Sequence, residues 1–360
     1  MTTDGSSVVT VELRPRVHVD LRTRAVVLGV VGLAVAAIAL VLGVAVGTVP
    51  IHPLDTLAVV LERTLGIRVG GIPSAAVETI VWDLRVPRVL TTMVVGAGLA
   101  VAGATFQGLL RNPLADPYVL GTASGAALGA AIALLIPIRG LILGWGLLHG
   151  LAFAGALASV FTVYRLSRIS GIAPLTGLLL TGYAVGSLLA AGLAMAMYLS
   201  GSALRQIFVY LLGGFDGASW DRLVGMLPIV VAGSALIILR ARSLNGLLLG
   251  EETAAHLGID VRRERAILLA LASLVTAASV TVSGLIGFVG LVVPHVVRLA
   301  VGPNARGVLP LAATWGACLL AFSDIAARLL GEIPVGVVTA VIGAPFFLVL
   351  LRRARTGYEL

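Results

Sequence analysis

The sequence predicts an all-α polytopic membrane protein with about ten transmembrane helices. Of its 360 residues, 59% are hydrophobic and only 12% are charged, and the mean hydropathy is +1.07. Soluble domains carry about 25% charged residues. The apolar residues also gather in long runs, and a helix that crosses the bilayer needs about 20 of them. Composition and run length therefore both place most of the chain in lipid.

The apolar runs divide the chain into ten predicted spans. These are 25–48, 88–110, 118–137, 141–163, 173–199, 223–240, 266–284, 286–301, 308–330 and 335–351. The first run is too long for the apolar region of a signal peptide, which covers about 7–15 residues. We therefore expect one ten-span membrane domain over 25–351, with polar tails at 1–24 and 352–360.

The distribution of charge predicts an orientation. All 25 basic residues are arginine, and an even number of spans places both termini on one side. With the termini in the cytoplasm, about twice as many arginines lie inside as outside, as the positive-inside rule requires. This orientation also puts the polar segment 241–265 in the cytoplasm and the long connection 49–84 outside.

Several functions are excluded by composition. Because the chain contains no lysine, it cannot form a P-loop, which needs Gly-Lys-Ser/Thr to hold phosphates. The single Cys318 gives no disulfide framework. The five histidines are scattered and form no His-Glu-x-x-His motif, so the sequence predicts no metal site and no hydrolase.

Two connections are predicted to contain short helices. Residues 54–65 alternate apolar and polar side chains at helical spacing, so we expect a surface helix there. In the cytoplasmic connection, Glu251 and Glu252 would lie in the first turn of a helix, where acids interact favourably with the helix dipole. Gly258 would end this helix, since glycine is the preferred C-terminal stop.

A weak inverted repeat is also predicted. Arg85-x-x-Arg88 precedes one apolar span, and Arg262-x-x-Arg265 precedes another that has the opposite orientation by span parity. Repeats of opposite orientation are typical of many transporters.

The turn from Gln107 to Gly121 is the most informative segment. It contains Arg111, Asp116 and two prolines between two apolar spans. Irregular backbone at membrane depth is tolerated only where protein or a water-filled cavity satisfies its polar groups. The turn therefore indicates a lined pathway.

Several motifs together resemble one family. In chain order they are Arg85 to Arg88, Gln107 to Pro117, Gly121 to Ala126, Leu211 to Trp220, Gly287 to Arg298 and Gly343 to Phe347. This series is similar to the FecCD-type permeases, the membrane subunits of ATP-binding cassette (ABC) importers for iron-siderophores, haem and cobalamin. The resemblance covers about residues 80–351.

The resemblance implies a type II importer permease fold in the bacterial cytoplasmic (inner) membrane. It implies a permease dimer, of identical chains or with a paralogue, two ABC ATPase subunits and an extracytoplasmic binding protein, and no nucleic acid. ATP and Mg would be bound by the ATPases, so we expect no cofactor and no catalytic residue in this chain. A ferric siderophore is the expected substrate, with cobalamin or haem as alternatives. An ion-coupled secondary transporter is a further alternative, for which only Asp324 is a candidate buried charge.

The resemblance also implies three groups of site residues. The ATPase coupling residues are Glu251, Glu252, Ala255, Leu257 and Gly258. The binding-protein docking residues are Arg85, Arg88 and Arg328. The translocation gate residues are Asn112, Leu114, Leu175 and Thr176.

Structural alternatives remain open at these positions. The arginines can extend to the membrane interface or pair with acids of the same chain. Asn112 can cap a turn and Leu114 can simply pack. Asp324 can take part in proton coupling, or it can bond to Arg328, which lies four residues further along the same helical face.

Overall fold

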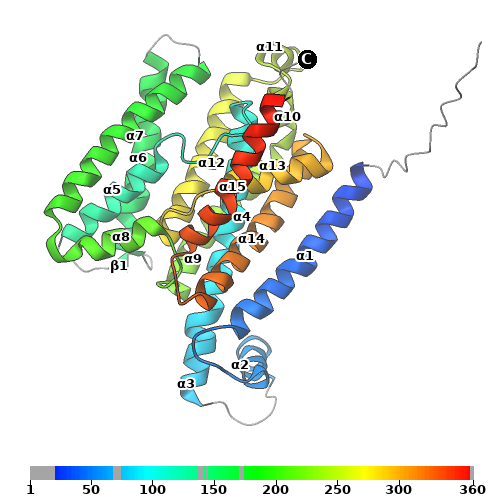
Figure 1. Cartoon of the computed structure of the whole chain (residues 1–360). Coiled ribbons are helices and arrows are strands. Elements are labelled where there is room, and N and C mark those ends of the chain that lie inside the picture. Colours follow the sequence, from blue (N-terminus) through cyan, green and yellow to red (C-terminus); the bar gives the residue numbers. More distant parts are fainter. Residues whose placement is uncertain (1–20, 68–73, 137–140, 143–144, 170–173, 357–360) are drawn as a thin grey trace, which may run out of the picture.

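The computed structural model is a bundle of helices and describes all residues except 1–20, 68–73, 137–140, 143–144, 170–173 and 357–360 (Figure 1). The predicted N-terminal tail therefore falls largely outside the described residues, whereas the predicted C-terminal tail begins inside the last helix, which extends to Thr356. Helices α2 and α3 lie at one end of the bundle, and α10 and α11 lie at the opposite end (Figure 1).

Ten helices correspond to the ten predicted spans. They are α1 (Leu21–Ala45), α4 (Val86–Leu109), α5 (Thr122–Leu135), α6 (Leu147–Ile169), α7 (Pro174–Leu199), α9 (Trp220–Leu239), α12 (Val261–Ser283), α13 (Val289–Val301), α14 (Ala305–Leu329) and α15 (Val335–Thr356). Among the described residues, seven helices are long and apolar enough to cross a membrane, and three further apolar helices are shorter. The predicted fold class is confirmed.

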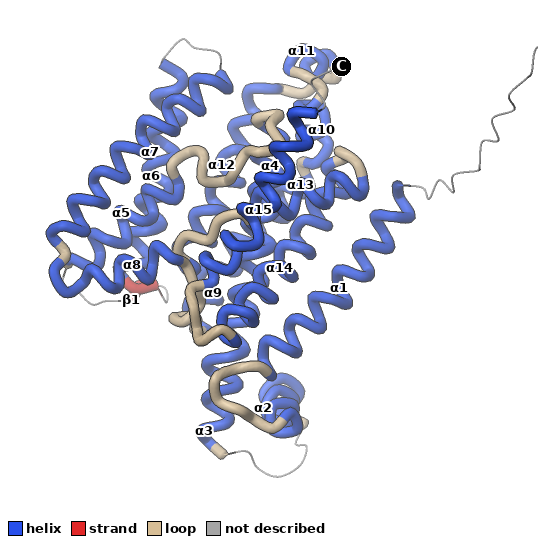
Figure 2. Tube along the Cα trace, in the orientation of Figure 1, coloured by secondary structure: helices blue, strands red, loops and turns tan. Residues whose placement is uncertain are grey.

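Short elements connect these helices. They are α2 (Pro53–Leu65), α3 (Ala75–Glu78), a π-helical stretch (Thr79–Arg85), a 3-10 helix (Gly201–Ala203), α8 (Leu204–Leu212), α10 (Ala241–Leu248) and α11 (Glu251–His256). Strands β1 (Leu141–Ile142) and β2 (Trp145–Gly146) form a two-stranded antiparallel pair. Helix dominates the described chain (Figure 2). The surface helix expected at 54–65 is confirmed as α2.

The connection before α12 differs from the sequence prediction. The connection 241–265 was expected to hold one short helix, but α10 precedes α11 and α12 begins at Val261. A search for apolar runs misses α10 because polar residues interrupt it. The predicted boundary between the spans 266–284 and 286–301 is confirmed as a break, since Gly284 has a φ of 66° and Phe288 a φ of 70°.

Helix α4 lies at the centre of the bundle. It packs against α9, α12, α13 and α14. In the most apolar 18-residue stretch of this helix, 78% of the residues are buried, compared with 11% in the corresponding stretches of α1 and α7. Glycine allows this close packing: a Cβ atom at Gly103 would lie 1.8 Å from the carbonyl oxygen of Gly290 in α13. Helix α4 is therefore the element on which the others are positioned.

Helices α4 and α12 run in opposite directions. The end of α4 contacts α10, and the start of α12 contacts α10 and α11, so the two ends lie together. This agrees with the orientation that the inverted repeat requires. The repeat itself stays a prediction.

Candidate functional site

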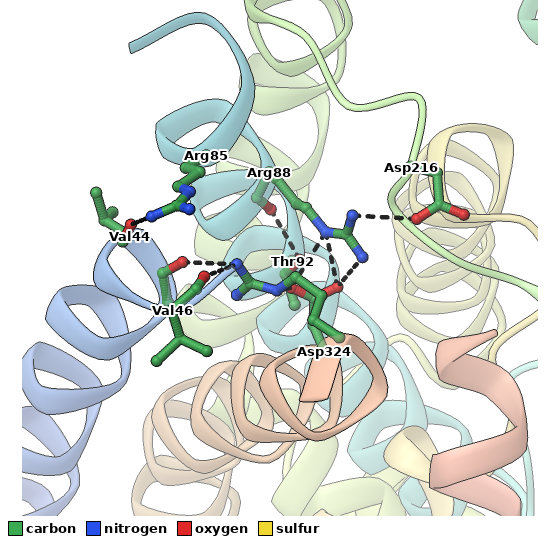
Figure 3. A network of polar contacts seen from close by, with 9 residues as sticks. Val44, Val46, Arg85, Arg88, Thr92, Asp216 and Asp324 are labelled. Carbon is green, nitrogen blue, oxygen red and sulfur yellow. Dashed lines mark hydrogen bonds and ion pairs between the residues drawn. The ribbon is translucent and has the colours of Figure 1, made fainter. Parts of the chain in front are cut away.

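The predicted docking arginines gather where α4 begins. Arg85 directly precedes α4, Arg88 lies in its first turn, and Arg328 comes from the last turn of α14. Figure 3 shows Arg85 beside Val44 at the end of α1, and Arg88 beside Asp324. The chain thus brings three arginines from distant positions into one polar network.

Arg85 and Arg328 bind the end of α1. The acceptors are the carbonyl oxygens of Gly43, Val44, Ala45, Val46 and Val49. Arg85 Nη1 donates to Ala45 at 2.9 Å, and Arg328 Nη1 donates to Gly43 at 2.8 Å. The last carbonyls of a helix lack partners within it, so a guanidinium with several donors is a suitable cap. Both arginine residues are buried, with 6% exposure.

Asp324 holds two arginines together. Its Oδ1 lies 2.9 Å from Arg88 Nη2, its Oδ2 lies 3.1 Å from Arg328 Nε, and the side chain is 1% exposed. Asp324 thus forms the contact with Arg328 that its spacing predicted, as an ion pair, and accepts its hydrogen bonds from Arg88. Because a buried charge must be paired, this contact explains how a carboxylate is tolerated in α14.

Arg88 also has a contact towards the surface. Its Nη1 lies 3.1 Å from Oδ1 of Asp216, whose side chain is 59% exposed. A cavity of about 270 Å³ adjoins the pair and is also lined by Arg85, Arg328 and Glu332. The docking role of the three arginines stays a prediction, and Arg88 is the one bonded to an exposed acid.

Two of the four predicted gate residues, Asn112 and Leu114, lie where α4 ends, and the other two lie at the start of α7. Oδ1 of Asn112 accepts a hydrogen bond from the Leu114 backbone N–H at 2.9 Å, so Asn112 does cap the turn. Leu114 is half-buried, Asn112 is exposed, and Thr176 is exposed in the first turn of α7 beside Leu175. Helix α7 also contacts this turn, since a Cβ atom at Gly182 would lie 2.5 Å from the Val119 carbonyl oxygen. The gating role of the four residues stays a prediction.

Arg111 anchors the gate turn to α10. Its φ is +47°, a value rare for a residue other than glycine. Its Nε donates to the Leu247 carbonyl oxygen at 3.0 Å, although Leu247 lies 136 residues away. Nothing in the sequence paired these two positions.

Gln107 is a polar residue that the sequence did not single out as functional. It is 2% exposed, its Nε2 donates to the Leu291 carbonyl oxygen at 3.0 Å, and its Oε1 accepts from Arg298 Nη1 at 2.8 Å. Its place inside the Gln107 to Pro117 motif was the available signal. The residue ties the last turn of α4 to α13.

Asp116 and Tyr118 fix the far side of the turn. Asp116 Oδ1 accepts from the Tyr118 backbone N–H at 2.8 Å, and the Tyr118 hydroxyl donates to the Ile286 carbonyl oxygen at 2.8 Å. Burial raises the pKa of the Asp116 carboxyl to about 6, and the hydrogen bond from Tyr118 partly opposes this. Asp116 is thus a turn residue whose charged form is disfavoured by desolvation.

The predicted coupling residues form an exposed surface. Glu251, Glu252, Ala255, Leu257 and Gly258 are all exposed, whereas Ala254 is fully buried and holds α11 on the bundle. Gly258 has a φ of +78°, which confirms it as the stop of this helix. Glu251 also pairs with Arg265 of α12 at 2.5 Å. The coupling role stays a prediction.

The described residues include no group of three or more His, Cys, Asp or Glu side chains placed to hold a metal ion. The features described above are a buried ionic network, an exposed short helix and a turn between them. A central helix with polar contacts at both ends of a bundle of apolar helices is the architecture of a polytopic membrane protein.

Comparison with known proteins identifies the family. The FecCD transport family model matches residues 35–353. The chain is 47% identical over 283 residues to the permease protein of a cobalamin import system from Halobacterium salinarum, covering 78% of this chain and 75% of that protein. It is 42% identical to the permease protein of a hemin transport system from Yersinia pestis, covering 76% of this chain and 84% of that protein.

Two further matches complete the comparison. The permease protein of an Fe(3+)-citrate import system from Bacillus subtilis is 38% identical, covering 77% of this chain and 83% of that protein. A solved inward-facing structure of a metal-chelate type ABC transporter matches with a TM-score of 0.78 and 29% identity, covering 90% of this chain and 98% of that one. This chain belongs to the FecCD transport family and is a permease subunit of an ABC importer.

Proposed function

We propose that this permease imports a metal chelate delivered by an extracytoplasmic binding protein and driven by two ATPase subunits. The observation that carries the proposal is the arrangement around α4. An arginine-lined cavity lies at its start, and its end is bonded to α10, which leads directly into the exposed α11. One rigid element thus connects a surface suited to acidic side chains with a surface suited to an ATPase.

The proposal assigns sides to the membrane. Arginine bias supports a cytoplasmic α10–α11 end, with both termini in the cytoplasm, and an external α2–α3 end. The protein would lie in the cytoplasmic (inner) membrane as a dimer, and the exposed apolar faces of α7 and α15 are available for this contact. Examples are Tyr183 and Leu188 of α7 and Val341 of α15.

Cobalamin is the first substrate to test. The relative with 47% identity is named for cobalamin import. A ferric siderophore, which the sequence motifs led us to expect, is the second candidate, because the relative named for Fe(3+)-citrate carries a ferric chelate. Haem is the third, on the strength of the relative named for hemin transport.

The test is ATP-dependent uptake into liposomes. The liposomes hold this chain with its cognate ATPase and binding protein. Labelled cobalamin, a labelled ferric siderophore and labelled haem are each offered alone and against the other two compounds. ATP-dependent uptake of one compound, with competition only by that compound unlabelled, would assign the substrate.

The control separates transport from leakage. An ATPase variant that binds but does not hydrolyse ATP must abolish uptake while the complex still assembles. Equal uptake with this variant would contradict an ABC importer and favour an ion-coupled transporter. Absence of ATP-dependent uptake for all three compounds would refute the proposed substrate class.

A further inference from the structure

Asp216 lies in the connection between α8 and α9, on the boundary between two cavities. The first is the cavity of about 270 Å³ with Arg85, Arg88 and Arg328. The second, of about 200 Å³, is also lined by Arg222 and His149. One exposed carboxylate therefore faces arginines from both sides.

The residues that precede Asp216 are held in place by burial and hydrogen bonding, whereas Asp216 itself is exposed. Phe215 is 1% exposed, and the Gly214 backbone N–H donates to the Ser283 carbonyl oxygen at 2.8 Å. Asp216 and Gly217 are exposed, and the side chain of Arg222 donates to the Gly217 carbonyl oxygen. The Asp216 carboxylate can thus change partner by side-chain rotation, while Phe215 keeps the connection in place.

Carboxylates are scarce inside the arginine cluster. Asp324 is the buried carboxylate there, and it serves both Arg88 and Arg328. Within the described part of the chain, Arg328 Nη2 has no hydrogen-bond partner. The acidic residues that line this cavity, Asp216 and Glu332, are both exposed. A carboxylate arriving from outside would be attracted to this cluster.

Asp216 occupies the contact that such a carboxylate would take. Asp324 contacts Nε and Nη2 of Arg88, so Nη1 is available to a second acceptor. Oδ1 of Asp216 lies 3.1 Å from this Nη1 atom. A guanidinium presents its donors in a fixed fork. An incoming acid therefore competes with Asp216 for this edge of Arg88.

We propose that Asp216 is a built-in competitor for docking, which holds Arg88 until an acidic side chain of the binding protein displaces it and which then turns towards Arg222. The proposal rests on the proposed function and concerns the regulation of the docking surface. Displacement leaves no charge unpaired, because Arg222 lines the second cavity beside Asp216. Competition from the same chain would keep docking weak and reversible.

The test measures binding-protein affinity for the permease–ATPase complex in nanodiscs. Asp216→Asn keeps the shape of the side chain and removes its charge. A partly exposed ion pair contributes little, so we expect Kd to fall about two- to fivefold in Asp216→Asn at low ionic strength. The gain should shrink in high salt, which screens exposed charges.

Asp221→Asn is the matched control. Asp221 is an exposed acid in the first turn of α9, five residues from Asp216, and it lines neither cavity. We expect its Kd to equal that of the wild type. Equal tightening in both variants would reduce the effect to net charge and overturn the proposal, as would unchanged or weaker docking of Asp216→Asn.

Arg222→Gln tests the second position of the carboxylate. It should weaken docking where Asp216 is present and have no effect in the Asp216→Asn background. An equal effect in both backgrounds would refute the exchange with Arg222. If the wild-type complex does not bind the protein at all, the proposed function itself is wrong, so the two failures are distinguishable.

Discussion

The two ends of α4 are built from different contacts. At its start, Arg88 bonds a fully buried carboxylate, and the neighbouring Arg85 caps α1. At its end, Gln107 and Arg111 bond backbone carbonyls of α13 and α10, and Gln107 also accepts from Arg298. Breaking a buried ion pair costs about 3–5 kcal/mol, which is more than the roughly 1–3 kcal/mol of losing a hydrogen bond between a charged and a neutral group. The start of α4 is therefore suited to remain fixed, and the end is suited to rearrange.

The sharpest test of this difference is Asp324→Ala. The change leaves two guanidinium groups without their shared buried carboxylate, and such losses cost about 3–5 kcal/mol. We expect the largest fall in thermal unfolding temperature of the detergent-solubilised protein for this variant. Asp221→Ala, at an exposed acid, is the control and should leave that temperature unchanged; similar values for the two would contradict a fixed start of α4.

Gln107→Leu tests the other end. The substitution keeps the size of a buried side chain but leaves the Leu291 carbonyl oxygen and Arg298 without their partner, at a cost of about 1–3 kcal/mol. The loss of thermal stability should be clearly smaller than in Asp324→Ala, because Arg298 is half-buried and can reach water. Gln206→Leu, at an exposed residue of α8, is the matched control. A loss as large as that of Asp324→Ala would remove the distinction between the ends.

Gly258→Val tests whether α11, the short helix that follows α10, couples ATP hydrolysis to transport. The φ of +78° disfavours any side chain by about 1–2 kcal/mol, while a Cβ atom there would meet no neighbour within 4 Å. We expect ATP hydrolysis to continue while cargo transported per ATP falls in reconstituted liposomes. Gly150→Val is the control, since Gly150 also has open space but lies in α6 without positive φ. An unchanged transport ratio in Gly258→Val would count against coupling through α11.

Arg63→Ala should have the smallest effect. Arg63 pairs with Glu78 at 2.5 Å, but the two side chains are 51% and 41% exposed. Exposed pairs contribute about 0–1 kcal/mol, so the unfolding temperature should barely change. A loss comparable to that of Asp324→Ala would mean that charge pairing near α2 matters irrespective of burial.

The apolar runs were sufficient to predict the spans. A membrane helix must satisfy its own backbone in lipid, so its length and composition are visible in the sequence. The i,i+4 spacing of Asp324 and Arg328 likewise predicted a contact that the structure shows. Gly258 also predicted the end of α11, because glycine readily adopts the positive φ at which helices often end.

The partners of the arginines could not be predicted in the same way. Arg85 binds carbonyls about 40 residues away, and carbonyls are present at every residue, so the sequence carries no trace of the choice. Helix α10 was missed because its alternation of polar and apolar residues resembles a loop in a hydropathy profile. These contacts depend on how the helices pack, which a single sequence does not specify.

The capping of α1 has a consequence for biogenesis. Arg328 donates to the Gly43 carbonyl oxygen across 285 residues, and α1 has little buried surface of its own. During synthesis the first helix enters the bilayer long before the residue that completes its C-terminal end emerges from the ribosome. The hydrogen bond from Arg328 to the end of α1 can therefore form only after α14 has been inserted.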